Sequence, residues 1–292
     1  VSTEGTFPTS IAIDDGVLYA INGGDDGSLV AFDRNIDTGT LSDTPVMSYG
    51  FDFGFDGIPT GFDRNLAPGD IAFDSDKRRL MMVYAGGGEM EDTTGLANLP
   101  QPVIDAFPSL PTGQIYSWEL DNDGFIIGDP EIRDAEGILP FAIEFTENGW
   151  GLVVAAITGS LTSYEFTGVG AEVATVFGRV ETGIFESCWI RVTDSRYGYV
   201  TNPFEGTVSS FFINRDGTIE LVEQTAATTG LPTDIALSKD ESHLYILTPM
   251  SGQLQSYAID HNTGGLSFSG AAGGLPTFAD NGYSSYGLAV RN

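Results

Sequence analysis

One short β-strand recurs along the chain, as Ile11-Ala12-Ile13, Ile71-Ala72-Phe73, Ile143-Glu144-Phe145, Ile190-Arg191-Val192, Ile235-Ala236-Leu237 and Leu288-Ala289-Val290. Four copies carry a proline three residues before the first apolar position, at Pro8, Pro68, Pro140 and Pro232. A second and a third strand follow each of the first five copies, and in four of them an Asp/Asn–Gly turn comes after the third strand. Repeats of roughly 40–50 residues, with about four strands in each, are typical of β-propellers. We therefore expect an all-β propeller of four-stranded antiparallel blades in which six inner strands are visible.

The spacing of the repeat predicts where each blade begins. Ile143, Ile190 and Ile235 follow one another at intervals of 47 and 45 residues, whereas the other intervals are longer. We expect one domain over residues 1–292, with blades that begin near residues 8, 68, 140, 187, 232 and 285. The extra residues fall in two insertions, 49–66 and 86–112. The second insertion is rich in proline and shows no strand-like alternation, and Val103–Phe107 fits one helical turn. Long loops on a sheet scaffold either carry function or are merely tolerated.

Composition excludes several classes of partner. The chain has 41 acidic and 12 basic residues, and its net charge is −29. Such a field repels phosphate backbones and anionic lipids, so we expect no nucleic-acid partner. No apolar run approaches the length of a membrane-spanning helix, so we expect no membrane insertion. The charge is typical of a secreted or salt-adapted protein, and we expect an extracellular location. Cys188 has no partner for an internal disulfide, and its apolar neighbours predict a buried thiol.

Several segments resemble a known family. Gly198-Tyr199-Val200-Thr201-Asn202, Leu139-Pro140-Phe141, residues 230–238 and residues 274–290 are similar to the lactonase-type (YVTN-type) seven-bladed β-propellers. That group includes 6-phosphogluconolactonase-like and 3-carboxymuconate-cyclase-like proteins. The resemblance implies a lactone hydrolase, an enzyme of the carboxylic ester hydrolase type. Ser2–Pro8 resembles the junction that enters the family's third blade. The resemblance thus implies that one to two N-terminal blades are missing here, or that another chain completes the ring.

The polar residues of the inner strands form the candidate site. Alternation along each strand places Glu144 and Arg191 at one equivalent position and Asp70 and Asp234 at another. We predict that Glu144 and Arg191 are catalytic, with the glutamate as general base and the arginine as the group that holds an anion. The predicted substrate-binding residues are Asp70, Asp234, Glu186 and Trp189. No metal ligands are assigned, and calcium held by the carboxylates stays open as a cofactor.

Each candidate also has a structural interpretation. Asp70 and Asp234 stand at the head of a strand, where a carboxylate often joins neighbouring blades by accepting backbone N–H bonds. Glu144 and Arg191 then pair with each other, and Trp189 packs between blades. His243 and His261 fall in turns outside the inner strands, which argues against chemistry of the muconate-cyclase type.

Two functions remain open from the sequence. The first is hydrolysis of a sugar lactone or a muconolactone-type substrate in an acidic central channel. The second is a non-catalytic extracellular propeller that binds a small-molecule ligand, a glycan or a protein partner. A small-molecule or carbohydrate-like ligand is possible for both.

Overall fold

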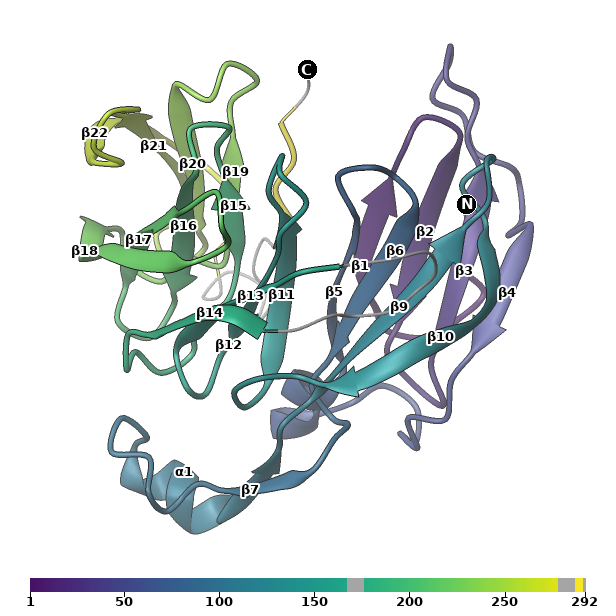
Figure 1. Ribbon diagram of the computed structural model, residues 1–292, viewed down its shortest axis with the longest axis horizontal. Helices are drawn as coiled ribbons and strands as arrows, with labels where there is room; N and C mark the ends of the chain where they lie inside the picture. Colours follow the sequence, from purple (N-terminus) through teal and green to yellow (C-terminus); the bar gives the residue numbers. More distant parts are fainter. Residues whose placement is uncertain (167–175, 278–286, 291–292) are drawn as a thin grey trace. The chain divides into compact units, whose positions relative to one another are not determined.

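The computed structural model describes residues 1–166, 176–277 and 287–290, which form antiparallel sheets (Figure 1). Sheet 1 contains β1 (Pro8–Ile13), β2 (Val17–Asn22), β3 (Ser28–Asp33) and β4 (Met47–Gly50). Sheet 2 contains β5 (Pro68–Phe73), β6 (Arg79–Tyr84), β9 (Gln114–Leu120) and β10 (Ile126–Asp134). Sheet 3 contains β11 (Pro140–Phe145), β12 (Gly151–Ala155), β13 (Ser160–Tyr164) and β14 (Val176–Glu181).

Two further sheets follow in the same pattern. Sheet 4 contains β15 (Ile190–Val192), β16 (Tyr197–Asn202), β17 (Thr207–Ile213) and β18 (Ile219–Thr228). Sheet 5 contains β19 (Asp234–Leu237), β20 (His243–Thr248), β21 (Gln253–Ile259) and β22 (Leu266–Gly273). These four-stranded antiparallel sheets confirm the predicted all-β fold of propeller type. Five of the six recurring segments lie in the first strand of a sheet. Leu288–Val290 is not part of a strand, and the predicted blade start near residue 285 lies outside the described residues.

The chain divides into two compact units, each with its own core. The described residues of the first unit are 1–95, 101–153 and 164–166, and those of the second are 96–100, 154–163, 176–277 and 287–290. In the first unit, sheets 1 and 2 bury a core that includes Tyr19, Leu80 and Trp118. In the second unit, sheets 4 and 5 bury a core that includes Tyr199 and Tyr257. Burial of large aromatic side chains between sheets supplies the main driving force for their packing.

A buried aspartate joins three sheets of the first unit. Oδ1 of Asp70 accepts hydrogen bonds from the backbone N–H of Ile71, at 2.9 Å, and from the Ser10 hydroxyl of β1, at 2.6 Å. Oδ2 of the same carboxylate accepts the backbone N–H of Ile143 in β11, at 3.3 Å. Gly69, the preceding residue, lies so close to the Phe141 carbonyl that a Cβ atom there would collide with it. The strand heads therefore approach closely enough for one carboxylate to bind all of them.

Asp234 repeats this arrangement in the second unit. Its Oδ1 accepts the backbone N–H of Ile235 at 2.7 Å, and its Oδ2 accepts the N–H of Leu288. Leu288 thus occupies the place that Ile143 has beside Asp70, although it is not in a strand. Asp70 and Asp234 thus make the contacts expected of carboxylates that join neighbouring strand heads by accepting backbone N–H bonds.

Buried tyrosines join the outer ends of neighbouring sheets. The Tyr19 hydroxyl on β2 donates to the carbonyl of Gly124 at 3.0 Å, in the turn between β9 and β10. The equivalent Tyr199 on β16 donates to the carbonyl of Gly264 at 3.1 Å, in the turn between β21 and β22. Burial is the main cause that raises the pKa of both tyrosines, so both hydroxyls stay protonated donors. These two Asp/Asn–Gly turns therefore close hairpins, and their glycine carbonyls also accept a hydrogen bond from a tyrosine of the preceding sheet.

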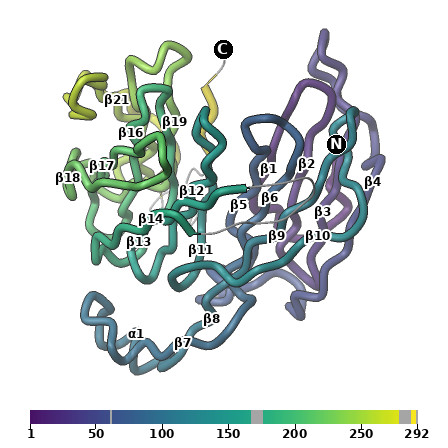
Figure 2. The backbone as a smooth tube through the Cα atoms, in the orientation of Figure 1, coloured from purple at the N-terminus to yellow at the C-terminus, as the bar shows by residue number. Residues whose placement is uncertain are grey.

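The second insertion, residues 86–112, has more regular structure than the sequence predicts. Met90–Asp92 (β7) pairs with Ser109–Pro111 (β8), although the sequence shows no strand-like alternation there. Strands of three residues are too short to produce a recognisable alternation. The predicted helical turn exists as α1 (Gln101–Ala106), shifted slightly from Val103–Phe107. Figure 2 shows the path from β6 through β7, α1 and β8 back to β9.

The first insertion, residues 49–66, ends in a 3-10 helix, η1 (Gly61–Leu66). The Phe62 ring there stacks on Phe107 of the second insertion, with centroids 4.1 Å apart. Phe51 and Phe53 pack against the core of sheets 1 and 2. None of the helices in the described part of the chain combines the length and the apolar character needed to cross a bilayer.

One face of sheet 1 is left open. Ile11 and Ile13 of β1 are 62% and 51% exposed, whereas the equivalent Ile71 and Ile235 are 3% and 0% exposed. Ile71 and Ile235 are covered because the preceding sheet packs on that face of their strands. An apolar pair exposed at this position is typical of a surface that another element covers.

The contacts of Asp70 lead to a prediction about stability. In an Asp70→Ala variant the buried N–H of Ile143 loses its acceptor, so the free energy of unfolding should fall by about 1–3 kcal/mol or more. An Asp123→Ala variant is the control, because Asp123 is exposed in an outer turn and should change stability by less than about 0.5 kcal/mol. Urea unfolding of the two variants and the wild type measures the difference. Equal stability of both variants would refute the structural role of Asp70.

Candidate functional site

The predicted site residues fall in both compact units. Glu144 is half-buried on β11 in the first unit, next to Ile143, whose N–H binds Asp70. Arg191, Asp234, Glu186 and Trp189 lie in the second unit. The two groups are therefore described separately.

Arg191 and Asp234 come together in the second unit. β15, which carries Arg191, lies beside β19, which begins at Asp234. Burial raises the pKa of the Asp234 carboxyl, while the nearby charge of Arg191 and the two backbone N–H bonds act in the opposite direction. Arg191 also donates from Nη1 to the carbonyl of Ile190 at 2.7 Å. The inner strands of sheets 4 and 5 thus bring a guanidinium near a buried carboxylate.

Glu186 has an unusual backbone conformation and a half-buried side chain. It lies in the loop that leads into β15, with φ +58°, in the left-handed region that non-glycine residues rarely adopt. The side chain is half-buried, and burial raises its pKa to about 7. Among the described residues, no hydrogen-bond donor is found for its carboxylate. A carboxyl group with this pKa can both accept and return a proton near neutral pH, which is typical of catalytic sites.

The sequence around Glu186 explains its raised pKa. Residues 182–190, Thr-Gly-Ile-Phe-Glu-Ser-Cys-Trp-Ile, contain no other charged side chain. The Glu186 backbone N–H donates to the carbonyl of Ala156, at 2.8 Å, in the turn between β12 and β13. That turn, Ala156-Ile157-Thr158-Gly159, carries no charge either. Because apolar surroundings disfavour the ionised form, the carboxyl holds its proton more tightly than an exposed glutamate does.

Cys188 and Trp189 have mainly structural contacts. The predicted burial of Cys188 is only partly correct, because the residue is half-buried while its neighbour Ser187 is fully buried. Burial, and to a smaller extent the Glu186 carboxylate, raises the pKa of the Cys188 thiol. Trp189 packs against the core of sheets 4 and 5, and its backbone N–H donates to the Thr201 hydroxyl at 3.0 Å. These contacts match the packing interpretation of Trp189.

Two buried asparagines were not singled out by the sequence analysis. Asn22 and Asn202 end the second strands of sheets 1 and 4. Asn202 accepts from the Ser187 hydroxyl at 2.8 Å and donates to the Ser209 hydroxyl at 2.9 Å. Asn22 likewise accepts from the Thr3 hydroxyl, at 2.6 Å. Both asparagines follow the apolar residues of a second strand, and this shared position in the sequence could have identified them. Asn202 fixes the loop that carries Glu186.

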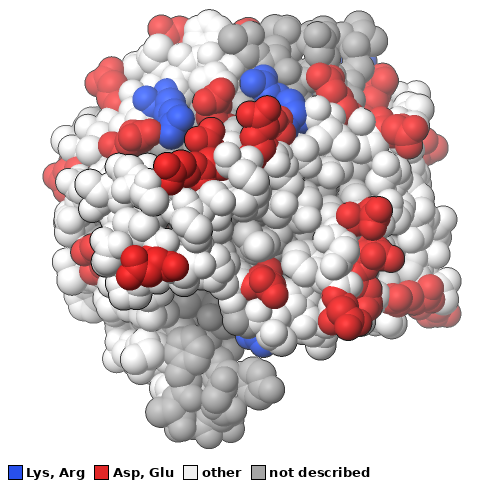
Figure 3. Space-filling model, turned by 90° about the horizontal axis from the view of Figure 1, so that it is seen from below, with Lys and Arg blue, Asp and Glu red and all other residues white. Residues whose placement is uncertain are grey.

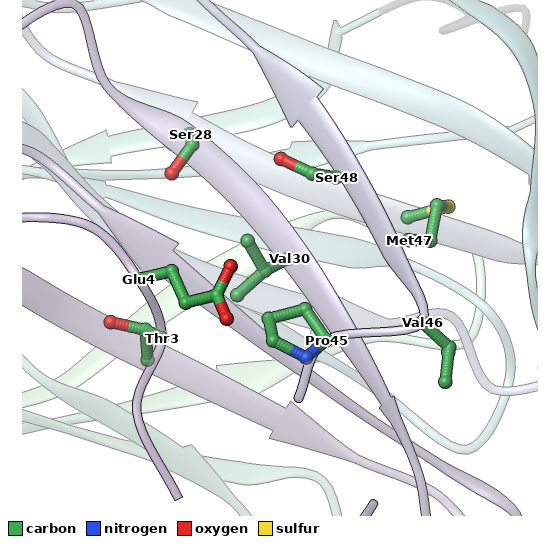
Figure 4. Close-up of a pocket in the computed structure, with 8 residues that line it drawn as sticks. All are labelled: Thr3, Glu4, Ser28, Val30, Pro45, Val46, Met47 and Ser48. Carbon is green, nitrogen blue, oxygen red and sulfur yellow. The ribbon is translucent and has the colours of Figure 1, made fainter. Parts of the chain in front are cut away.

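A small pocket lies away from the predicted site residues. It occupies about 250 Å³ beside sheet 1 and is lined by Thr3, Glu4, Ser28, Val30, Pro45, Val46, Met47 and Ser48. Figure 4 shows the Glu4 carboxylate between Val30 and Pro45, with the Ser28 and Ser48 side chains on neighbouring strands. Glu4 is the charged group of this lining, and it is exposed. None of the predicted catalytic or substrate-binding residues lines this pocket.

One face of the molecule shows how the acidic side chains are distributed. On the face in Figure 3, acidic side chains are distributed widely and few basic side chains lie among them. In residues 1–166, 176–277 and 287–290, no cluster of three or more His, Cys, Asp or Glu side chains is arranged to hold a metal ion.

Comparisons with known proteins support the fold. A family model described as "Lactonase, 7-bladed beta-propeller" matches residues 171–278. No curated protein matches the chain. A solved structure of a putative 6-phosphogluconolactonase from Bacteroides uniformis has a TM-score of 0.71 at 15% identity, and the match covers 94% of this chain and 73% of that one.

Two further solved structures are similar over most of their length. A putative 6-phosphogluconolactonase from Bacteroides fragilis has a TM-score of 0.62 at 14% identity, with 95% of this chain and 87% of that chain covered. The periplasmic gluconolactonase of Pseudomonas aeruginosa has a TM-score of 0.53 at 12% identity, with 92% and 86% covered. These comparisons agree with the resemblance read from the sequence: a lactonase-type family model matches part of the chain, and the solved structures share its β-propeller fold.

Proposed function

We propose that the protein hydrolyses an uncharged lactone at a site that includes Glu186 and Arg191. The observation that carries this proposal is the half-buried Glu186 carboxyl, whose pKa burial raises to about 7. An ionised Glu186 takes a proton from a water molecule as that water attacks the lactone carbonyl carbon. The guanidinium of Arg191 stabilises the negative charge that develops on the carbonyl oxygen. The ring C–O bond then breaks, and the proton passes to the ring oxygen to give the hydroxy acid.

Glu144 remains the second candidate for the general base. It was predicted as catalytic from its place after Ile143, and it is half-buried on β11. The pKa of Glu186, which burial raises to about 7, is the reason to prefer Glu186 as the base. Replacing each glutamate separately distinguishes the two assignments.

An uncharged substrate fits the charges of the chain better than a phosphorylated one. Lysine and arginine side chains are the usual partners of a bound phosphate. The chain has two lysines, Lys77 and Lys239, and a net charge of −29. Lys77 lies beside Asp14 at 3.8 Å, in a turn of the first unit. We therefore favour a sugar lactone of the kind named for the Pseudomonas gluconolactonase over a phosphorylated or muconolactone-type substrate.

The alternative is a non-catalytic propeller that binds a ligand, a glycan or a protein partner. The exposed Ile11 and Ile13 favour a protein contact at sheet 1. On this alternative, a further blade or another chain covers these side chains and completes the ring. No lactone hydrolysis is then expected in any variant.

The catalytic assignment leads to a prediction about activity. Glu186→Gln and Arg191→Ala should each lower kcat/KM for glucono-δ-lactone by about 10²-fold or more, because each removes a group needed in the transition state. Glu144→Gln should have a smaller effect. Hydrolysis is followed with a pH indicator and corrected for the spontaneous reaction, and the 6-phosphorylated lactone should be a poorer substrate. A wild-type rate that Glu186→Gln leaves unchanged would remove Glu186 from the mechanism, and preference for the phosphorylated lactone would contradict the substrate class.

The raised pKa of Glu186 leads to a prediction about pH. Carboxyl ¹³C shifts should show one glutamate that titrates near pH 7 in the wild type and is absent in Glu186→Gln. Because the folded protein holds this proton more tightly than the unfolded chain, whose ordinary pKa is 4.5, the contribution of Glu186 to stability declines as the pH rises from 4.5 to 7. If Glu186 is the base, kcat/KM should rise over the same range as the carboxylate forms. A midpoint near 4.5 would contradict the proposed environment.

A further inference from the structure

Part of the second insertion lies against the turn that contacts Glu186. The side-chain amide of Asn98 donates to the carbonyl of Ile157 at 3.1 Å. The Glu186 backbone N–H donates to the carbonyl of the adjacent residue, Ala156, at 2.8 Å. Residues 96–100 belong to the same compact unit as the turn and Glu186. Two consecutive carbonyls of one turn therefore bind the insertion and the Glu186 loop.

The turn between β12 and β13 is held firmly from the side of the Glu186 loop. Both the backbone N–H and the hydroxyl of Thr182 donate to the carbonyl of Gly159, each at 2.8 Å. Gly159 has φ +57°, and a Cβ atom there would collide with the backbone of Ile184. Ala156 and Ile157 are each 1% exposed. The turn is thus well fixed, and both the insertion and the Glu186 loop are bound to it.

These three elements carry a single charge among them. Residues 96–100, 156–160 and 182–190 contain no Asp, Glu, Lys, Arg or His other than Glu186. Cys188 is the other titratable group, and its thiol stays neutral because burial raises its pKa. Leu99 of the insertion is almost fully buried. The lack of other charged side chains in these segments favours the protonated form of the Glu186 carboxyl.

We propose that Asn98 is a positioning residue that holds the Leu96–Pro100 segment against the 156–159 turn and so limits the access of water to Glu186. The inference deepens the proposed function, because on that function Glu186 is the general base. Asn98 itself takes no part in the chemistry. Its amide ties an apolar segment, anchored by Leu99, to the turn that the Glu186 loop also binds.

The inference is tested by the titration of Glu186 in an Asn98→Ala variant. Without the hydrogen bond from the Asn98 side chain, the segment is released and water reaches Glu186. The titration midpoint of Glu186 should then fall from about 7 by roughly one pH unit, a tenfold change in proton affinity. Asn98→Gln keeps an amide donor and should restore part of the shift. Asn122→Ala is the matched control, because Asn122 is exposed in an outer turn. The ¹³C carboxyl shift of Glu186 is the readout, and Glu186→Gln assigns it.

Each outcome decides a separate point. A lowered midpoint in Asn98→Ala alone, with the circular dichroism of the folded protein retained, supports the inference even if no lactone is hydrolysed. A midpoint equal to that of the wild type, or the same shift in Asn122→Ala, overturns it even if the protein is an active lactonase. If activity is present, the pH profile of kcat/KM should move with the midpoint in Asn98→Ala.

Discussion

A buried aspartate that accepts backbone N–H groups from its own strand and from the next inner segment is the interaction on which the architecture depends. Asp70 binds Ile71 and Ile143, and Asp234 binds Ile235 and Leu288. A carboxylate in the interior is costly unless donors surround it, and here the strand heads supply those donors. The same bonds fix how closely neighbouring first strands approach, as the contact of Gly69 with Phe141 shows. The loops that precede these strands are then held in place.

The candidate site follows from this arrangement of the strand heads. Glu186 lies just before β15, in a loop bound to the turn between β12 and β13 and to Asn202 through Ser187. Arg191 lies near Asp234, so part of its charge offsets a buried carboxylate that already serves the fold. Glu186 differs because no opposing charge is found for it among the described residues, and burial raises its pKa. A carboxyl that is costly to ionise is a poor structural element and a suitable proton acceptor near neutral pH.

The repeat was predictable because apolar residues, prolines and Asp/Asn–Gly turns recur in the same order along the chain. Those signals are local, and they identified the first strands of the five four-stranded sheets in the described part of the chain, as well as Asp70 and Asp234 at two of the strand heads. The short β7–β8 pair was not predictable, because a strand of three exposed residues has no periodic pattern. The position of Asn98 against Ile157 depends on how an irregular loop folds back, over 59 residues of sequence. The sequence did hold a signal for the raised pKa of Glu186, because no charged residue lies near it in the chain. The shift itself depends on burial, which only the folded chain provides.

The central claim, that aspartate carboxylates bind the N–H groups of the next inner segment, is tested most directly at Leu288. This residue is outside any strand, so the account assigns the protection of its amide to Asp234 alone. Hydrogen exchange measured by NMR should show the Leu288 amide strongly protected in the wild type and exchanging freely in an Asp234→Ala variant that keeps its fold. Exchange of the wild-type Leu288 amide at the rate of an unstructured peptide would contradict the account.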